Sequence, residues 1–435
     1  MRVGQTLLPH LVRLHTLPLY IIALALMSGG FIQLSLLQGF SPLYVAAIFV
    51  WGLCFSGIEI IIARRLPQSN VILPPIVAFL TVLGLLMTAR LAMNFLARQI
   101  IWLLISSFVL STIISFPNTL TWLRRFKYTW LVGGLGLLSL TFIFGVNPSG
   151  FGARFWLGFW GVFFQPSETL KILIVVFLAV YLSDHRQQMI DISATFSVTR
   201  FGLNLKLPHL AHFGPMLLMW GFSILLLFWQ GDLGAALLFF CTFLGMLYAA
   251  VGQRRYVIVG VLLLLFAGAL GYWRFAYVAV RVDGWWNPWL DPDGASFQIV
   301  QSLLAFANGG WLGQGLGQGL PTAIPVVHTD FVFAAIGEEY GLLGALTVLT
   351  CFGLIVHQAF QISLYRITHF QQLLALGIGL MLGIQALVIA GGTLKLIPLT
   401  GVTMPFISYG GSSLLTSFIM IGLLLLLANQ TSDKI

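Results

Sequence analysis

Long apolar runs separated by short polar segments dominate the hydrophobic pattern of the chain. A helix that crosses a bilayer needs about 20 mostly apolar residues, because the hydrocarbon core is about 30 Å thick. The runs are continuous and do not alternate between apolar and polar residues, which favours helices over a transmembrane β-barrel. We therefore predict an all-α polytopic membrane protein with about twelve spans, over residues 17–37, 42–63, 71–89, 98–116, 128–147, 168–184, 212–229, 232–251, 256–273, 331–357, 371–394 and 412–430.

The composition agrees with this pattern and excludes a soluble protein. Of the 435 residues, 59% are hydrophobic and only 8% are charged, too few charges to cover a soluble protein of this length. The net charge of +9 would suit a nucleic-acid-binding protein, but the basic residues stand in short clusters between apolar runs. Such clusters mark cytoplasmic loops, so we expect no nucleic-acid partner.

The positions of Lys and Arg predict which way the spans point. Cytoplasmic loops of membrane proteins carry an excess of basic residues. With a cytoplasmic N-terminus, most of the basic residues fall on the inner side, among them Arg2, Arg13, Arg64, Arg65, Arg124, Arg125, Lys127, Arg254, Arg255 and Lys434. We therefore expect both termini to be cytoplasmic.

The acidic residues show the opposite distribution. In this orientation most of them lie in outer loops or at the outer ends of spans, namely Glu168, Asp232, Asp283, Asp291, Asp293, Asp330, Glu338 and Glu339. Ionisable groups at membrane depth are costly and are candidates for functional sites. The longest loop, about 274–330, lies on the same side and is too long for a passive connection. We expect the chemistry to take place on the outer face.

Two short outer segments combine turn-forming and ionisable residues. The first is Gly152–Trp156, which includes Arg154, followed by Gln165-Pro166-Ser167-Glu168 and Lys171. Ser167 is a residue type that caps helices, and Glu168 and Lys171 share a helical face, so a local cap with an ion pair explains them as well as a ligand site does. The second is Gln230–Gly234, which reads as a turn with Asp232 capping the following helix.

The long loop carries the densest polar pattern. It contains Arg281, then Trp285-Trp286-Asn287-Pro288-Trp289-Leu290-Asp291-Pro292-Asp293-Gly294, then Gln298 and the glycine-rich segment 308–319. Trp suits the membrane interface, and Asp-Pro-Asp-Gly also reads as a plain turn. The glycines allow close backbone approach to a ligand. They lack a strand–helix unit and a Walker lysine, so they imply no nucleotide site.

Two further segments on the predicted outer side carry polar or ionisable residues. His328-Thr329-Asp330-Phe331 precedes the tenth span, and Glu338 and Glu339 lie about two turns deeper. A glutamate pair inside a span is hard to explain by packing alone. Residues 397–413 combine Pro, Gly and hydroxyl side chains and end at Ser412 and Ser413. Such a segment cannot form a lipid-facing helix, so it must be buried in protein or line a cavity.

These segments together resemble the SEDS family (shape, elongation, division and sporulation), which includes RodA and FtsW. The resemblance covers about residues 130–430 and is carried by PLTGVTMPFISYGGSS, FQPSETLK, NPWLDPDG and HTDFVFAAIGEEYGLLG, all in the family's order. It implies a peptidoglycan glycosyltransferase that polymerises lipid II, a disaccharide-pentapeptide on undecaprenyl pyrophosphate. It also implies a class B penicillin-binding protein as partner, alongside other elongation or division proteins, and it leaves a divalent-cation requirement open.

The resemblance also assigns roles to individual residues. The family's essential loop aspartate corresponds to Asp291, its arginine before the QPSE segment to Arg154, and the lysine after it to Lys171. As further substrate contacts we predict Glu168, Arg281, Gln298, Asp330, Glu338, Lys395 and Ser412.

The chain departs from the family in several places. Ten spans are usual, so two helices within residues 1–127 are additional, and residues 128–435 form the expected catalytic core. Phe155 replaces a second basic residue, Gly231 a proline, and Phe297 the tyrosine of a Gly-Tyr-Gln triplet. Fine details of substrate contact are therefore expected to differ from those of the family.

The predicted chemistry needs a base, because a sugar hydroxyl is a poor nucleophile until its proton is removed. Asp291 lies between Trp289 and Pro292, so we expect restrained, partly apolar surroundings that would strengthen it as a base, whereas Asp293 precedes Gly294 in a turn. Two other functions remain open, a lipid II flippase and a non-catalytic scaffold. A flippase should carry polar groups along the whole membrane path, and the inner halves of the spans are nearly free of charge, with Glu59 the main exception.

Overall fold

In the computed structural model the chain folds almost entirely into helices. The structure describes residues 16–67, 72–116, 118–147, 154–159, 162–191, 197–200, 203–206, 210–366 and 368–429. Arg2, Arg13 and Lys434, which contribute to the predicted orientation, lie outside these residues, as do Gly152 and Ala153 of the first motif. The predicted all-α class is confirmed.

The helices follow the predicted apolar runs. Within the described residues, eleven helices are long and apolar enough to cross a membrane, and each overlaps a predicted span. The remaining predicted span, 212–229, coincides with α9, whose shorter apolar stretch is Met216–Gln230. The helices are α2 (Leu17–Gln38), α3 (Pro42–Arg65), α4 (Leu73–Leu91), α5 (Leu96–Ser115), α6 (Thr119–Arg125), α7 (Lys127–Phe144), α8 (Pro166–Asp191), α9 (Leu210–Gln230), α10 (Leu233–Val251), α11 (Arg254–Arg274), α12 (Ala276–Trp286), α13 (Phe297–Gly309), α14 (Val332–Leu364), α15 (His369–Thr393) and α16 (Gly411–Asn429).

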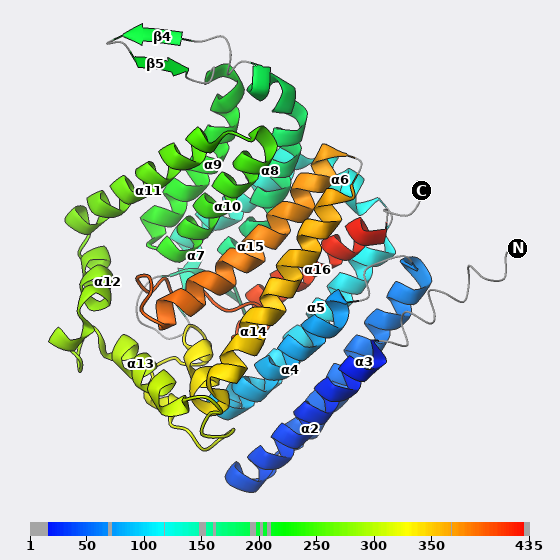
Figure 1. Cartoon of the computed structure of the whole chain (residues 1–435). Helices are drawn as coiled ribbons and strands as arrows, with labels where there is room; N and C mark the ends of the chain where they lie inside the picture. The colour runs from blue at the N-terminus through cyan, green and yellow to red at the C-terminus, as the bar shows by residue number, and fades with distance from the viewer. Residues whose placement is uncertain are drawn as a thin grey trace, which may run out of the picture. The chain divides into compact units, whose positions relative to one another are not determined.

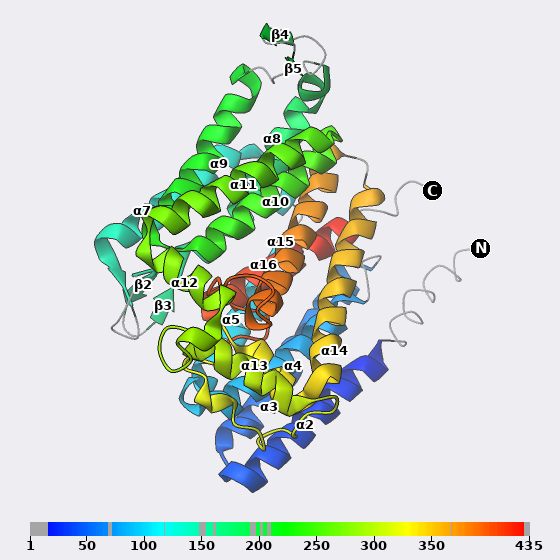
Figure 2. The same ribbon diagram turned by 60° about the vertical axis from the view of Figure 1, so that its left-hand side comes forward.

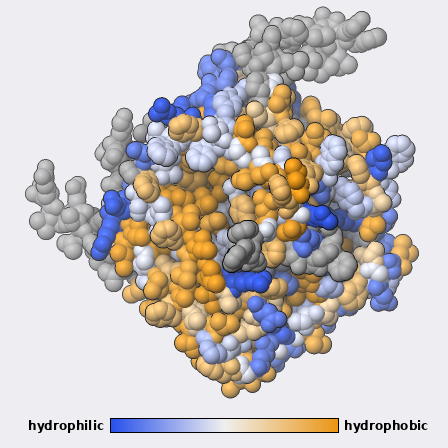
Figure 3. All heavy atoms as spheres, turned by 180° about the vertical axis from the view of Figure 1, so that it is seen from behind, coloured by the Kyte–Doolittle hydropathy of each residue, from blue (hydrophilic) through white to orange (hydrophobic). Residues whose placement is uncertain are grey.

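The outside of the protein is apolar where lipid would cover it. Figure 3 shows that hydrophobic side chains predominate on the face seen from behind. The helices differ in how far they are enclosed, since α4 and α16 are mostly buried whereas α11 is mostly exposed. Exposed Leu, Ile and Phe side chains on a spanning helix are stable only against hydrocarbon, which supports the prediction of a membrane protein.

Chain contacts divide the protein into two compact units. The first comprises residues 1–117, 268–358 and 382–435, and the second comprises residues 118–267 and 359–381. One unit boundary falls between α5 and α6, and the other three fall within α11, α14 and α15.

The second unit contains the few strands of the structure that the sequence did not predict. Strands β1 (Gly145–Val146), β2 (Trp156–Phe159) and β3 (Val162–Phe164) form an antiparallel sheet in that order. Gly145 pairs with Leu157, and Leu157 pairs with Phe164. A separate hairpin joins β4 (Ser197–Arg200) and β5 (Leu203–Lys206). The sheet links the end of α7 to the start of α8, so it fixes the chain that leads into the QPSE segment.

In the first unit, α2 and α3 form an antiparallel pair beside α4 (Figures 1 and 2). Tyr20 on α2 donates a hydrogen bond of 2.6 Å to Glu59 on α3, which satisfies the one carboxylate of these two helices. Near the other end of α2, the Gln33 side chain donates to the carbonyl oxygen of Leu316 at 2.8 Å. The pair is therefore fastened to the glycine-rich segment of the long loop.

The long loop is itself folded. It contains α12, α13 and two short 3-10 turns, Pro288–Leu290 and Pro321–Ala323. Its glycine-rich segment approaches a break in α14 at Gly341, where φ is +67°. A methyl group on Gly313 would lie 2.3 Å from the carbonyl oxygen of Glu339. These glycines thus permit close approach to the backbone of α14, in addition to the ligand role that the sequence suggested.

A buried ion pair holds this arrangement together. Arg90 at the end of α4 lies 2.8 Å from a carboxylate oxygen of Glu339 and also donates to the carbonyl oxygen of Gly319. The Arg90 and Glu339 side chains are 10% and 0% exposed, so neither charge is solvated. One side chain from α4 therefore joins α14 to the glycine-rich segment.

We expect Arg90→Met to destabilise the protein by about 3–5 kcal/mol, because it leaves the carboxylate of Glu339 buried without its partner. Thermal unfolding in detergent, followed by circular dichroism, measures the change. The matched control is Arg64→Met, at an exposed basic position at the end of α3, which should have little effect. The double variant Arg90→Met with Glu339→Leu should recover much of the loss, and an equal loss in the double variant would contradict this account.

Candidate active site

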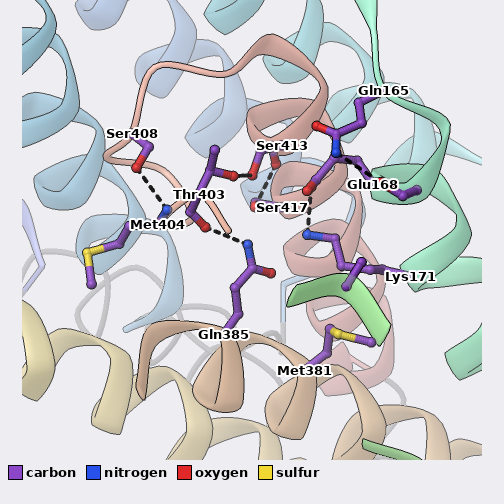
Figure 4. A network of polar contacts seen from close by, with 12 residues as sticks. Gln165, Glu168, Lys171, Met381, Gln385, Thr403, Met404, Ser408, Ser413 and Ser417 are labelled. Atoms are coloured by element: carbon purple, nitrogen blue, oxygen red, sulfur yellow. Dashed lines mark hydrogen bonds and ion pairs between the residues drawn. The ribbon is translucent and has the colours of Figure 1, made fainter. Parts of the chain in front are cut away.

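The second unit places the QPSE motif at the beginning of α8. Glu168 and Lys171 form an ion pair with 2.6 Å between the carboxylate and ammonium groups, and their side chains are 8% and 2% exposed (Figure 4). The predicted ion pair is confirmed. Glu168 lies in the first turn of α8, where the helix dipole favours a negative charge. The pair is buried, so Lys171 is engaged inside the protein.

Ser167 has a different role from the one expected. The helix begins at Pro166, so Ser167 is already inside the first turn and does not cap it. Its hydroxyl donates instead to Asp232 at 3.3 Å. The other carboxylate oxygen of Asp232 accepts the backbone N–H of Ala235 at 3.1 Å, which confirms Asp232 as the cap of α10. The two short outer motifs therefore meet in space, although 65 positions separate them.

Arg154 lies immediately before β2 in the same unit, and its side chain is exposed. Its backbone carbonyl lies against Gly145, where an added methyl group would come within 2.6 Å. The sheet thus holds the backbone of Arg154 in place while its guanidinium group faces solvent. A planar guanidinium that is free to reach a ligand is well suited to phosphate oxygens.

In the first unit, Asp291 follows the short turn Pro288–Leu290. Its carboxylate accepts the backbone N–H of Ala295 at 2.8 Å. A methyl group on Gly294 would lie 2.3 and 2.4 Å from the two carboxylate oxygens, so only glycine leaves room for this position. These contacts hold the carboxylate of Asp291, and the predicted restraint of its backbone stays a prediction. The predicted desolvation is wrong, because Asp291 is exposed and Trp289 beside it is 58% exposed.

Asp330, Arg281 and Gly401 come together from three separate segments. A methyl group on Gly401 would lie 3.5 Å from a carboxylate oxygen of Asp330 and 4.0 Å from the guanidinium of Arg281. Gln298 on α13 donates to the carbonyl oxygen of Pro325 at 3.1 Å, which ties α13 to the segment before Asp330. The structure therefore unites two predicted substrate contacts, while the Gln298 amide is engaged within the loop.

Residues 397–410 are irregular and mostly packed inside the first unit, as predicted. Gln385 donates to the carbonyl oxygen of Thr403 at 2.7 Å, and the Thr403 hydroxyl donates to Ser413 at 2.9 Å (Figure 4). Gly84 of α4 lies against the segment, since a methyl group there would be 2.4 Å from the carbonyl oxygen of Phe406. Ser412, a predicted substrate contact, is 5% exposed at the start of α16.

The glutamate pair of α14 contacts the glycine-rich segment. Glu338 accepts the backbone N–H of Leu320 at 3.1 Å, and Glu339 pairs with Arg90. Both glutamates are nearly inaccessible to solvent, at 4% and 1% exposed. Sequence reasoning missed Arg90, because it lies at the end of an early apolar run, 249 positions from its partner. A basic residue at the outer end of a span was the only local signal.

Lys395, the last predicted contact, follows the end of α15 in the first unit and is half-buried. No group of three or more His, Cys, Asp or Glu side chains that could hold a metal ion is present in the part of the chain that the structure describes. Of the predicted site residues, the ionisable ones that are exposed are Asp291 and Arg154, one in each unit.

The spanning helices, and the long loop folded onto them within the first unit, define a multi-pass membrane protein. The model of the family described as "Cell cycle protein", FTSW_RODA_SPOVE, matches residues 70–433. The chain belongs to this family, which is the SEDS family that its motifs resemble. Helices α2 and α3 precede the matched residues.

Curated relatives carry the same family names. The chain is 34% identical over 387 residues to "Peptidoglycan glycosyltransferase RodA" of Mycobacterium leprae, which covers 87% of this chain and 81% of that protein. It is 36% identical over 304 residues to "Probable peptidoglycan glycosyltransferase FtsW" of Geobacter metallireducens, covering 69% and 76%.

Solved structures share the fold. A chain from a structure titled "Structural coordination of polymerization and crosslinking by a peptidoglycan synthase complex" is similar with a TM-score of 0.68 and 27% identity, covering 84% of this chain and 99% of that one. The crystal structure of the rod shape determining protein RodA of Thermus thermophilus is similar in fold, with a TM-score of 0.58 and 24% identity over 84% of this chain and 98% of that one.

Proposed function

We propose that this protein is a peptidoglycan glycosyltransferase that polymerises lipid II on the outer face of the cytoplasmic membrane. The observation that carries the proposal is the exposed carboxylate of Asp291, held by Ala295 and Gly294 in a loop folded onto spanning helices. Relatives named as peptidoglycan glycosyltransferases support it. The excess of basic residues in the predicted inner loops supports cytoplasmic termini and an outward-facing site.

The reaction joins a sugar 4-hydroxyl to an anomeric carbon that carries pyrophosphate. Asp291 accepts the hydroxyl proton as the new bond between oxygen and the anomeric carbon forms. The bond from the anomeric carbon to the pyrophosphate oxygen breaks, and the lipid pyrophosphate leaves with its electron pair. One direct displacement inverts the α-linked donor to a β-linked glycan. Exposure of Asp291 suits a base that must meet an incoming hydroxyl.

The leaving pyrophosphate needs positive charge. Arg154 is exposed and offers two parallel N–H donors to phosphate oxygens. Lys171 is buried and already paired with Glu168, so its first role is to hold the beginning of α8. We therefore assign direct contact with the leaving group to Arg154, and an indirect positioning role to the pair of Lys171 and Glu168.

A class B penicillin-binding protein is the proposed partner. The similarity to a chain from a peptidoglycan synthase complex, whose title links polymerisation with crosslinking, supports this partner. Elongation and division proteins of the same cell are further proposed partners.

Purified protein in right-side-out vesicles should form glycan chains from lipid II supplied on the outside, with chains scored on a gel. Co-purified class B penicillin-binding protein should raise the yield. Movement of lipid II across the bilayer without chain formation would indicate a flippase. Chain formation that follows only the partner's own activity, and stops when that activity is inhibited, would indicate a scaffold.

Asp291→Asn should abolish or reduce chain formation by about 10²–10⁴-fold, the usual contribution of a general base. Lipid II binding and the amount of folded protein should not change, since the carboxylate is exposed. Gly294→Ala should reduce the rate in the same direction, because the new methyl group displaces the carboxylate from Ala295. Asp293→Ala is the matched control and should retain most activity. A largely active Asp291→Asn variant would exclude this mechanism and make Asp330 the next candidate.

Arg154→Ala should lower the polymerisation rate at least tenfold without changing the melting temperature, because the side chain is exposed and contributes charge stabilisation to the leaving group. Lys171→Met should instead lower the melting temperature, since it leaves the buried Glu168 carboxylate unpaired. The double variant Lys171→Met with Glu168→Gln separates the two effects. Recovery of stability without activity would show that Lys171 is also needed for the reaction, whereas recovery of both would limit it to structure.

A further inference from the structure

Lys395 has a backbone conformation that glycine adopts without strain. Its φ is +59°, and its backbone N–H donates to the carbonyl oxygen of Gly392 in the cap that ends α15. For any residue with a side chain this left-handed conformation brings the Cβ atom close to the following carbonyl oxygen and costs free energy. Among the described residues, the non-glycine positions with positive φ are Val326, Lys395 and Phe406, and Lys395 alone of these is charged. A lysine here has a cost in backbone strain that glycine would not have.

The face of α12 that carries Arg281 packs against the same segment. Trp285 donates its indole N–H to the carbonyl oxygen of Lys395 at 3.1 Å. Arg281 lies four positions earlier and therefore on the same helical face. Its guanidinium is 4.0 Å from where a methyl group on Gly401 would lie. Arg281 thus lies against the far end of the segment 395–401, and Lys395 begins that segment.

The charges here are unbalanced. Asp330 lies beside Gly401, with a carboxylate oxygen 3.5 Å from the same methyl position that is close to Arg281. The ammonium group of Lys395 has no carboxylate within 4.0 Å in the part of the chain that the structure describes. Lys395 as a residue is half-buried, so its side chain has lost part of its hydration without gaining an anionic neighbour. An anion that binds beside it would restore that balance.

We propose that Lys395, together with Arg281, forms an anion site in the first unit that binds the pyrophosphate of a lipid-linked saccharide. The inference rests on the proposed function. Each polymerisation step brings together two lipid pyrophosphates, one that leaves from the donor and one that stays on the acceptor. Lys395 with Arg281 serves the group that stays. The pyrophosphate held at Lys395 undergoes no bond change in the step, so this site acts on affinity.

Because the backbone at Lys395 is strained, variants at this position can separate the effect of its charge from the effect of the strain. Lys395→Gly removes the charge and relieves the backbone, whereas Lys395→Arg keeps both charge and strain. Val326→Gly is the matched control, because Val326 has φ +56° and is 56% exposed, so its replacement relieves similar strain without removing a charge. Binding is measured in detergent micelles on an Asp291→Asn background, so that no turnover consumes the ligand. The probes are fluorescent undecaprenyl pyrophosphate, inorganic pyrophosphate as competitor, and phosphatidylglycerol.

Lys395→Gly should weaken undecaprenyl pyrophosphate binding about tenfold or more, the loss typical of one charge-assisted hydrogen bond. Its melting temperature should stay the same or rise. Lys395→Arg and Val326→Gly should bind normally, and inorganic pyrophosphate should compete in all variants that bind. In the active protein, Lys395→Gly should raise the KM for lipid II and leave kcat nearly unchanged.

Two results would overturn the site. A lower melting temperature of Lys395→Gly with unchanged affinity would show that Lys395 only stabilises the carboxyl end of α15 through the helix dipole. An equal loss of phosphatidylglycerol binding would assign the site to ordinary phospholipid headgroups. Because binding is scored without turnover, a wild-type protein that binds the pyrophosphate but forms no glycan would reject the proposed function and not the site.

Discussion

The ion pair between Arg90 and Glu339 is the contact on which the loop that carries the site depends. Its two charges are shielded from water, and they connect the end of α4, the broken helix α14 and the glycine-rich segment. Hydrocarbon cannot hydrate a loose polar loop, so the backbone groups of that segment must find partners in the protein. Arg90 and Glu338 provide such partners, and Gln33 of α2 adds a third. The loop that bears Asp291 is therefore anchored to α2, α4 and α14.

Each candidate side chain is positioned by a feature of the backbone. A glycine leaves room for the carboxylate of Asp291, and a three-stranded sheet holds the backbone of Arg154 while its side chain stays exposed. Lys395 is positioned by a strained helix end. The arrangement separates two kinds of charge. Buried pairs such as Glu168 with Lys171 hold the structure, and exposed single charges remain available to a substrate.

Helices α2 and α3 extend the protein beyond the residues that the family model matches. They belong to the first unit, and Gln33 reaches the glycine-rich segment from α2. The predicted division of the chain between residues 127 and 128 stays a prediction. The contact of Gln33 gives the additional pair a defined place in the first unit, since it joins α2 to the glycine-rich segment, and Tyr20 joins the two helices of the pair to each other.

The sequence by itself determined the class of protein, the spans and the identity of the motifs. Continuous apolar runs can only be spanning helices, and local rules were enough to predict the cap at Asp232 and the pair of Glu168 with Lys171. Only the tertiary structure decided which charges are buried and which are exposed. The sequence neighbours of Asp291 suggested an apolar environment, yet its exposure depends on how the whole loop folds. Arg90 and Glu339, or Ser167 and Asp232, meet because helices distant in the sequence pack together, and no local pattern encodes the distance between such side chains.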